Sequence, residues 1–236
     1  MKNNIKGVIF DKDGTLLKFT DIWRLSLEEL FDYYELGEAD KIEIRQVVGV
    51  NEDCSIRENS ILASGTIADL AEVFSKYVHK SKEALDKEIS DFFLAYLAKH
   101  PELIVGTCDV KKCFDALKKL DIKVAVITAD SFKQAKLSFE MLGVYDEIDF
   151  LAAADFYPNK PDPSSLDAFC KDFGLSRKEV AVVGDSLIDL ELGKVAGLAV
   201  GVTCGVGTKE MLMKDADIVL DTPLDLISVL RQVNKY

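Results

Sequence analysis

Two carboxylates stand two residues apart near the start of the chain, directly after an apolar run. Asp11 and Asp13 follow Val8-Ile9-Phe10, and Gly14 comes next. Strands disfavour Asp, and a glycine at this point lets the backbone turn sharply. Two like charges this close repel each other unless a cation or a proton lies between them. A metal-assisted, covalent phosphoryl-transfer site requires this pattern.

Further polar positions follow apolar segments later in the chain. Thr128 follows the run 124–127, Lys160 lies in a proline-rich loop after a short apolar segment, and Asp185 follows the run 180–183. Asp189 lies four residues beyond Asp185, on the same face of a helix. Ligands of open parallel sheets bind outside the carboxyl ends of the strands, so we expect these side chains to converge. Each one alone could be a cap, a turn residue or a solvated charge, but their order at successive strand ends makes chance placement improbable.

The spacing of apolar residues divides the chain into two parts. Between residues 20 and 100 it is helical and predicts a block without strands, which ends near Pro101. Beyond Pro101, short apolar runs alternate with amphipathic segments, which is typical of a parallel sheet with helices on both faces. The predicted strands are 8–10, 123–127, 150–152, 180–183, 198–202 and 218–220, and the predicted helices are 110–120, 132–142, 164–173, 187–195 and 224–233. The helical block is therefore an insertion after the first strand.

Charge and composition limit the partners of the chain. With 29 basic and 41 acidic residues the net charge is −12, which argues against nucleic acid or an anionic membrane as a partner. Five cysteines show no Cys-x-x-Cys spacing, as is typical of reduced thiols. No segment matches a signal peptide or a membrane span, so we expect a cytoplasmic protein, either a monomer or a homodimer.

The strand-end residues together resemble the haloacid dehalogenase-like superfamily, in the phosphoglycolate-phosphatase-like branch with a helical cap. Its first motif, D-x-D-G-T, is similar to residues 11–15, and its fourth, G-D-S-x-x-D, to residues 184–189. Its second and third motifs correspond to Thr128 and Lys160. The resemblance implies a Rossmann-like three-layer α/β sandwich with a central parallel sheet. Residues 1–18 and 101–236 would form this core, and residues 19–100 the inserted helical cap.

The resemblance also implies how the first and fourth motifs act. Asp11 would be the nucleophile, forming an aspartyl-phosphate. Mg²⁺ would be held by the side chains of Asp11 and Asp185 and by the backbone carbonyl of Asp13. Asp13 would be the general acid and then the general base, which favours phosphate esters over haloacids. Gly14 would let the backbone approach the phosphate closely.

The remaining motif residues would surround the phosphoryl group. The Thr128 hydroxyl and the backbone N–H of Ala129 would donate hydrogen bonds to it. Lys160 would stabilise the nucleophile and the transferring group, and Asp189 would orient Lys160 or a metal-bound water. Where many relatives have Asn after the second-motif Thr, this chain has Ala129-Asp130, a departure that concerns the contacts to the phosphate.

The insertion is expected to act as a lid that selects the substrate. Its candidate contacts are Ser64, Thr66 and Arg24, together with Lys18 near the hinge. The leading hypothesis is a Mg²⁺-dependent phosphatase for a small phosphorylated metabolite, with phosphoglycolate as the first candidate. A phosphomutase or a pyrophosphatase on the same core remains open. So does a non-catalytic, receiver-like protein that binds a phosphorylated ligand.

Overall fold

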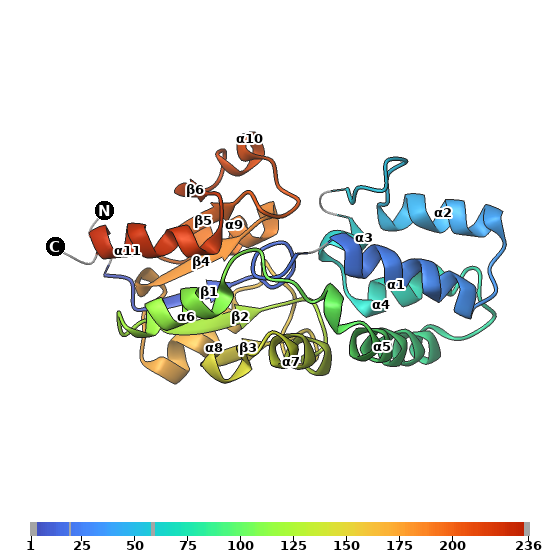
Figure 1. The fold of residues 1–236 in the computed structure, drawn as a ribbon, viewed down its shortest axis with the longest axis horizontal. Coiled ribbons are helices and arrows are strands. Elements are labelled where there is room, and N and C mark those ends of the chain that lie inside the picture. The colour runs from blue at the N-terminus through green and yellow to red at the C-terminus, as the bar shows by residue number, and fades with distance from the viewer. Residues whose placement is uncertain (1–3, 19, 58–59, 234–236) are drawn as a thin grey trace.

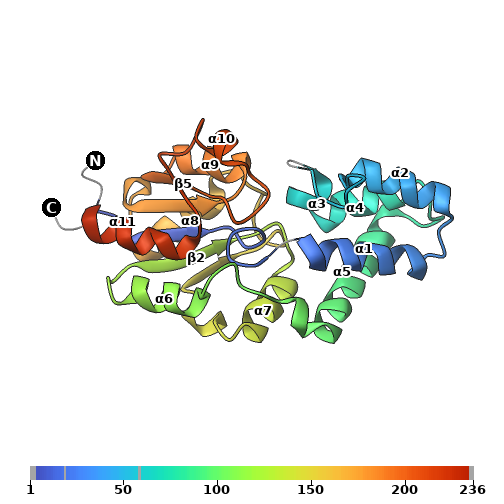
Figure 2. The ribbon, with the colours of Figure 1, turned by 45° about the horizontal axis from the view of Figure 1, so that its top comes forward.

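A computed structural model describes residues 4–18, 20–57 and 60–233 of the chain (Figures 1 and 2). It has two parts that lie next to each other: a sheet flanked by helices, and a group of helices inserted after the first strand. The expected α/β architecture with an inserted helical block is therefore confirmed.

The sheet has six strands in the order β3-β2-β1-β4-β5-β6, and all neighbouring strands pair in parallel. Continuous apolar runs form these strands because both faces of the sheet are covered. β1 lies in the middle, so the segment after it emerges between the ends of β2 and β4. The strands are β1 (Gly7–Phe10), β2 (Lys123–Ile127), β3 (Phe150–Ala152), β4 (Val180–Gly184), β5 (Leu198–Val202) and β6 (Ile218–Leu220).

Helices cover the two faces of the sheet and complete three layers. Val8 and Phe10 of β1 pack in one apolar cluster with side chains of α6, α7 and α11, whereas Ile9 packs in another with side chains of α8 and α9. This division follows from the alternation of side chains along a strand. The helices are α6 (Val110–Lys118), α7 (Phe132–Met141), α8 (Ser164–Phe173), α9 (Leu187–Lys194), α10 (Lys209–Leu212) and α11 (Leu226–Val233). Short 3₁₀ turns are η1 (Pro101–Leu103), η2 (Tyr145–Glu147), η3 (Arg177–Glu179) and η4 (Pro223–Asp225).

The inserted helices have an apolar core of their own. Leu27, Leu30 and Phe31 of the first helix pack with Phe74 and Phe93, all of them buried. Their helical spacing in the sequence reflects this shared core. The helices are α1 (Thr20–Tyr33), α2 (Glu38–Val48), α3 (Ile61–Ser64), α4 (Ile67–Phe74) and α5 (Lys82–Lys99). Residue 19, where we place the start of the cap, lies outside the described residues, and the exact cap boundaries stay a prediction.

The two segments that connect the insert to the core are hydrogen-bonded to each other. The Lys18 N–H donates to the Val105 carbonyl at 2.8 Å, and the Thr107 N–H donates to the Leu16 carbonyl at 3.0 Å. Leu17 and Gly106 form an isolated antiparallel bridge between these bonds. The chain therefore leaves the core and returns to it through one paired connection.

Two details differ from the sequence prediction. The expected helix at 224–233 begins as a 3₁₀ turn, because Thr222 and Asp225 form a capping box around Pro223, and the α-helix starts only at Leu226. The short helix α10 lies where the sequence predicts no element. Among the described residues, no helix combines the length and the apolar character needed to cross a membrane.

Candidate active site

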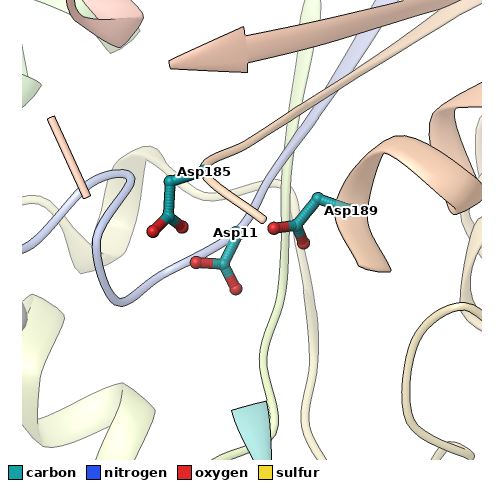
Figure 3. Close-up of side chains that lie close together, drawn as sticks. All are labelled: Asp11, Asp185 and Asp189. Atoms are coloured by element: carbon teal, nitrogen blue, oxygen red, sulfur yellow. The ribbon is translucent and has the colours of Figure 1, made fainter. Parts of the chain in front are cut away.

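Three carboxylates converge at the carboxyl ends of the two central strands (Figure 3). Asp11 follows β1 and its N–H donates to the Val183 carbonyl of β4 at 2.9 Å, which brings it beside Asp185. Asp189 reaches the same point from the first turn of α9. One oxygen of each carboxylate lies within 4.8 Å of those of the other two. The parallel topology therefore unites segments that are far apart in the sequence.

Lys160 is the partly buried cation of this cluster. Its Nζ lies 2.5 Å from Asp11 Oδ1 and 2.6 Å from Asp189 Oδ1. Burial acts to lower the pKa of Lys160, but the attraction of the two carboxylates outweighs it and raises that pKa, so the ammonium stays charged. Burial raises the pKa of Asp11 well above its ordinary value, against the influence of Lys160. Sequence reasoning expected Asp189 to orient Lys160, and the contact between them is present.

The Asp185 carboxylate is fixed from two sides. Its Oδ1 accepts a hydrogen bond from Thr15 Oγ1 at 3.2 Å, and its Oδ2 accepts one from the Val206 N–H at 2.7 Å. Burial, and after it the charge of Asp189, raises the pKa of Asp185 to about 7. Gly14 has a φ of +83°, and a Cβ there would come within 2.4 Å of Asp185 Oδ2. A glycine is therefore required where the loop after β1 passes this carboxylate.

The charges of this cluster suit a divalent metal ion. Two buried carboxylates and the partly buried carboxylate of Asp11 face a single lysine, and the resulting repulsion contributes to the raised pKa values of Asp11 and Asp185. A hard cation with oxygen ligands would remove this excess of negative charge. The residues present therefore fit a metal site, and Asp189 belongs to the cluster together with the predicted side-chain ligands Asp11 and Asp185. The carboxylate of Asp13 lies outside it, consistent with the expectation that only its backbone carbonyl would bind metal.

Asp13 belongs to a second buried charge group that sequence reasoning did not identify. Lys12 Nζ lies 2.7 Å from Asp13 Oδ1 and 2.9 Å from Asp130 Oδ2. Lys12 is only 2% exposed, and burial raises the pKa of Asp130 to about 6 although Lys12 opposes this. Asp130, part of the departure from the family pattern noted in the sequence, is therefore paired with Lys12, the residue between Asp11 and Asp13. The Asp130 departure was the one signal of this group that the sequence offered.

Thr128 and Ala129 follow β2, which flanks β1 on the side opposite to β4 and Asp185. The Thr128 N–H donates to the Ala152 carbonyl at 3.0 Å, and its Oγ1 accepts from the Asp130 N–H at 3.2 Å. Beyond them, Ser131 caps α7 by a capping box with Gln134. Thr128 and Ala129 thus lie just before the N-terminus of a helix, a position that favours anions.

A cavity between the core and the insert unites these groups. It encloses about 870 Å³ of empty space, part of which is open to solvent. All predicted site residues of the core line it except Gly14, which lies against the Asp185 carboxylate. Ser64 and Thr66 of the insert line it as expected, whereas Arg24 and Lys18 do not. Trp23 and Phe93 also line it, although their helical spacing in the sequence indicates only that each lies on the apolar face of its helix.

Comparison with known proteins places the chain in a family. The model of the haloacid dehalogenase-like hydrolase family matches residues 8–203, which include every motif described above. The chain belongs to this family. The resemblance seen in the sequence is therefore confirmed, and so is the expectation of a hydrolase.

Similar proteins are named for different phosphatase activities. The chain is 25% identical to the putative pyrophosphatase PpaX of Clostridium perfringens, covering 98% of this chain and 99% of that protein. It is 28% identical to the N-acetylmuramic acid 6-phosphate phosphatase of Pseudomonas putida, covering 96% of both. A predicted phosphoglycolate phosphatase from Haemophilus somnus has the same fold, with a TM-score of 0.72, 22% identity, and coverage of 96% of this chain and 98% of that one.

Proposed function

We propose that this family member is a Mg²⁺-dependent phosphatase that hydrolyses a small phosphorylated metabolite through a phosphorylated Asp11. The observation that carries the proposal is the Asp11 carboxylate itself. It lies at the end of the central strand and lines the cavity, its oxygen is held by Lys160, and a second aspartate stands two residues away. This is the arrangement that a carboxylate nucleophile with a neighbouring acid requires.

The chain's own residues account for both half-reactions. An oxygen of Asp11 forms a bond to phosphorus while the bond from phosphorus to the leaving oxygen breaks, and Asp13 gives its proton to that oxygen. Asp13 then takes a proton from water, and the attack of this water releases phosphate and restores Asp11. Lys160, held by Asp189, keeps the nucleophile in place and adds positive charge beside the transferring group. Lys12 fixes the carboxylate of Asp13 from the side.

The residues that would hold the cation are Asp11, Asp185 and the backbone carbonyl of Asp13, with Asp189 adjacent. When bound, Mg²⁺ supplies positive charge that offsets the phosphate and the clustered carboxylates. Thr128 and the N–H of Ala129 are placed to donate hydrogen bonds to phosphoryl oxygens from the other side of the cavity.

The names of the relatives suggest candidate substrates. Phosphoglycolate, the first expectation from the sequence, pyrophosphate and N-acetylmuramic acid 6-phosphate each occur in the name of a similar protein. A phosphomutase would use the same aspartyl-phosphate but return the phosphoryl group to a second hydroxyl. A panel of phosphorylated compounds distinguishes these activities.

Substitution of the nucleophile tests the proposal. We expect Asp11→Asn to lower Mg²⁺-dependent phosphate release from p-nitrophenyl phosphate and from the panel by roughly 10³-fold or more. The matched control is Asp172→Asn, the same change at an exposed residue of α8, which should leave the rate unchanged. Circular dichroism establishes that both variants are folded. Turnover by Asp11→Asn at the wild-type rate would contradict the mechanism.

A further inference from the structure

The cavity has two walls of opposite character. The core side carries the charged groups described above, whereas the cap side, here called the roof, is uncharged. Its aromatic members are Trp23 and Phe93, its aliphatic members include Leu62 and Leu70, and its hydroxyls are those of Ser64 and Thr66. Trp23, Leu62, Leu70 and Phe93 are each at most 9% exposed. A substrate whose phosphate lies against the core must therefore place its leaving group against this roof.

The roof offers no positive charge to a second anionic group. Among the described residues that line the cavity, Lys160 is the sole cation, and it is already paired with Asp11 and Asp189. The undescribed positions 19, 58 and 59 hold no basic residue in the sequence. A second cavity adjoins the first at Thr66 and Asn159, and there the described lining has one lysine among three aspartates. Lys12 Nζ lies 5.8 Å from the centroid of the Trp23 ring, but Asp13 and Asp130 already pair with it. The described side chains that line the space for the leaving group are therefore mostly apolar, hydroxylated or acidic.

Among the described side chains of the roof, one hydrogen-bond donor is buried without a partner. Thr66 Oγ1 is engaged with Asp69 in the capping box of α4, and Ser64 Oγ donates to the Ser60 carbonyl at 3.3 Å. The indole Nε1 of Trp23 is buried and has no acceptor within the described structure. Because a buried donor without an acceptor is unfavourable, this N–H is suited to a ligand oxygen. The indole ring beside it suits an apolar C–H face.

We propose that the leaving group of the substrate is a neutral, hydroxylated alcohol of the sugar or polyol class, not an anion. This inference rests on the phosphatase activity proposed above and specifies its substrate class. A carboxylate or a second phosphate would be desolvated against the roof without a counter-charge, which is strongly unfavourable. A neutral alcohol would bury its C–H groups on Trp23 and offer an oxygen to the indole N–H. The cavity therefore disfavours phosphoglycolate and pyrophosphate as physiological substrates.

Matched pairs of esters test this selectivity. Ethylene glycol monophosphate and phosphoglycolate share a two-carbon skeleton and differ in a hydroxymethyl or a carboxylate group. Glucose 6-phosphate and 6-phosphogluconate form a second pair. We expect kcat/KM to be at least about tenfold higher for the neutral member of each pair. The free energy needed to bury an unpaired charge is at least as large as the free energy that corresponds to this tenfold change. Equal or higher kcat/KM for the charged members, or for pyrophosphate, would overturn the proposal.

A binding measurement separates this proposal from the catalytic one. Trp23 is the only tryptophan of the chain, so its fluorescence reports on the roof directly. The four esters are titrated into Asp11→Asn with Mg²⁺, and tighter binding of the neutral members supports the proposal even if no ester is turned over. If the charged members bind as tightly, the selectivity proposal fails, whatever the turnover results show.

Two substitutions in the roof test its parts. Ser64→Lys introduces the missing cation, and we expect it to raise kcat/KM for phosphoglycolate relative to ethylene glycol monophosphate. Ser64→Met, which is similar in length and uncharged, should not change this ratio. Trp23→Phe removes the N–H but retains an aromatic ring, and should raise KM for glucose 6-phosphate more than for phenyl phosphate. An unchanged ratio in Ser64→Lys would contradict the role of charge in this wall.

Discussion

The Asp185 carboxylate should make the metal-free protein less stable at neutral pH, and Asp185→Asn should reverse this. The substitution removes one of three clustered negative charges but retains the shape of the side chain. The amide oxygen can accept the hydrogen bond from the Val206 N–H, and the amide N–H can donate to the Thr15 hydroxyl, which rotates to accept it. The variant is therefore expected to fold without an unpaired polar group at this position.

The size of the effect follows from the pKa of Asp185. Its pKa of about 7 in the folded protein, against about 3.9 in the unfolded chain, corresponds to about 4 kcal/mol of destabilisation above pH 7. Because the folded state binds this proton more tightly, the contribution of Asp185 to stability is most favourable below about pH 4 and becomes unfavourable as the pH rises to about 7. The advantage of Asp185→Asn should thus be about 4 kcal/mol at pH 8 and less than half of this at pH 5.

Thermal or urea unfolding in the presence of a chelator measures this difference. For a protein of this size, 4 kcal/mol corresponds to a rise in Tm of roughly 8–16 °C. Adding Mg²⁺ should stabilise the wild type, by about 2.7 kcal/mol at one hundred times its Kd, and should have much less effect on the variant. The reasoning is refuted if Asp185→Asn gains nothing at pH 8, or if its gain is the same at pH 5. An equal response of both proteins to Mg²⁺ would exclude Asp185 as a ligand.

Two further substitutions examine the loop after β1. Lys12→Met should lower the free energy of unfolding by about 3–5 kcal/mol, because it leaves buried Asp130 and partly buried Asp13 without their cation. The double variant Lys12→Met/Asp130→Asn should recover part of this loss in urea unfolding. A loss below about 0.5 kcal/mol would show that the pair is solvated. Gly14→Ala should reduce both stability and phosphatase activity, because its Cβ would meet Asp185. The control is Gly143→Ala, where φ is +71° and the added Cβ would have no atom within 4 Å. This control should lose stability alone. Equal activity in the two alanine variants would show that the close approach at Gly14 is unimportant.

The strands and most helices of the core could be predicted from the sequence because each has a distinct pattern. A strand buried on both faces needs an uninterrupted apolar run, and β2, β3, β5 and β6 begin and end as predicted. The convergence of the motif residues also followed from local information, since a parallel sheet gathers the carboxyl ends of its strands at one edge. The order of the strands was not specified, because every apolar strand offers similar backbone partners to its neighbours.

The parts of the site that escaped prediction depend on contacts between distant segments. Helical spacing indicates that Trp23 and Phe93 are buried, but not that they face the core across a cavity. That depends on how the insert packs on the sheet. Lys12 lies in a motif position where the side chain has no prescribed role, and its burial depends on Asp130 on another strand. By contrast, the contact of Lys160 with Asp189 was predictable, because both lie in recognised motifs.

The paired connection between core and insert has a consequence for how such proteins can be recombined. Because residues 16–18 and 105–107 are hydrogen-bonded to each other, the ends of the insert remain together whatever lies between them. An insertion with adjacent ends places little constraint on the domain that accepts it. Exchange of the segment between Lys18 and Val105 for that of another family member should therefore leave Asp11 and the sheet in register. Under the proposals made above, the catalytic chemistry and the choice of leaving group would be carried by units that can be inherited separately.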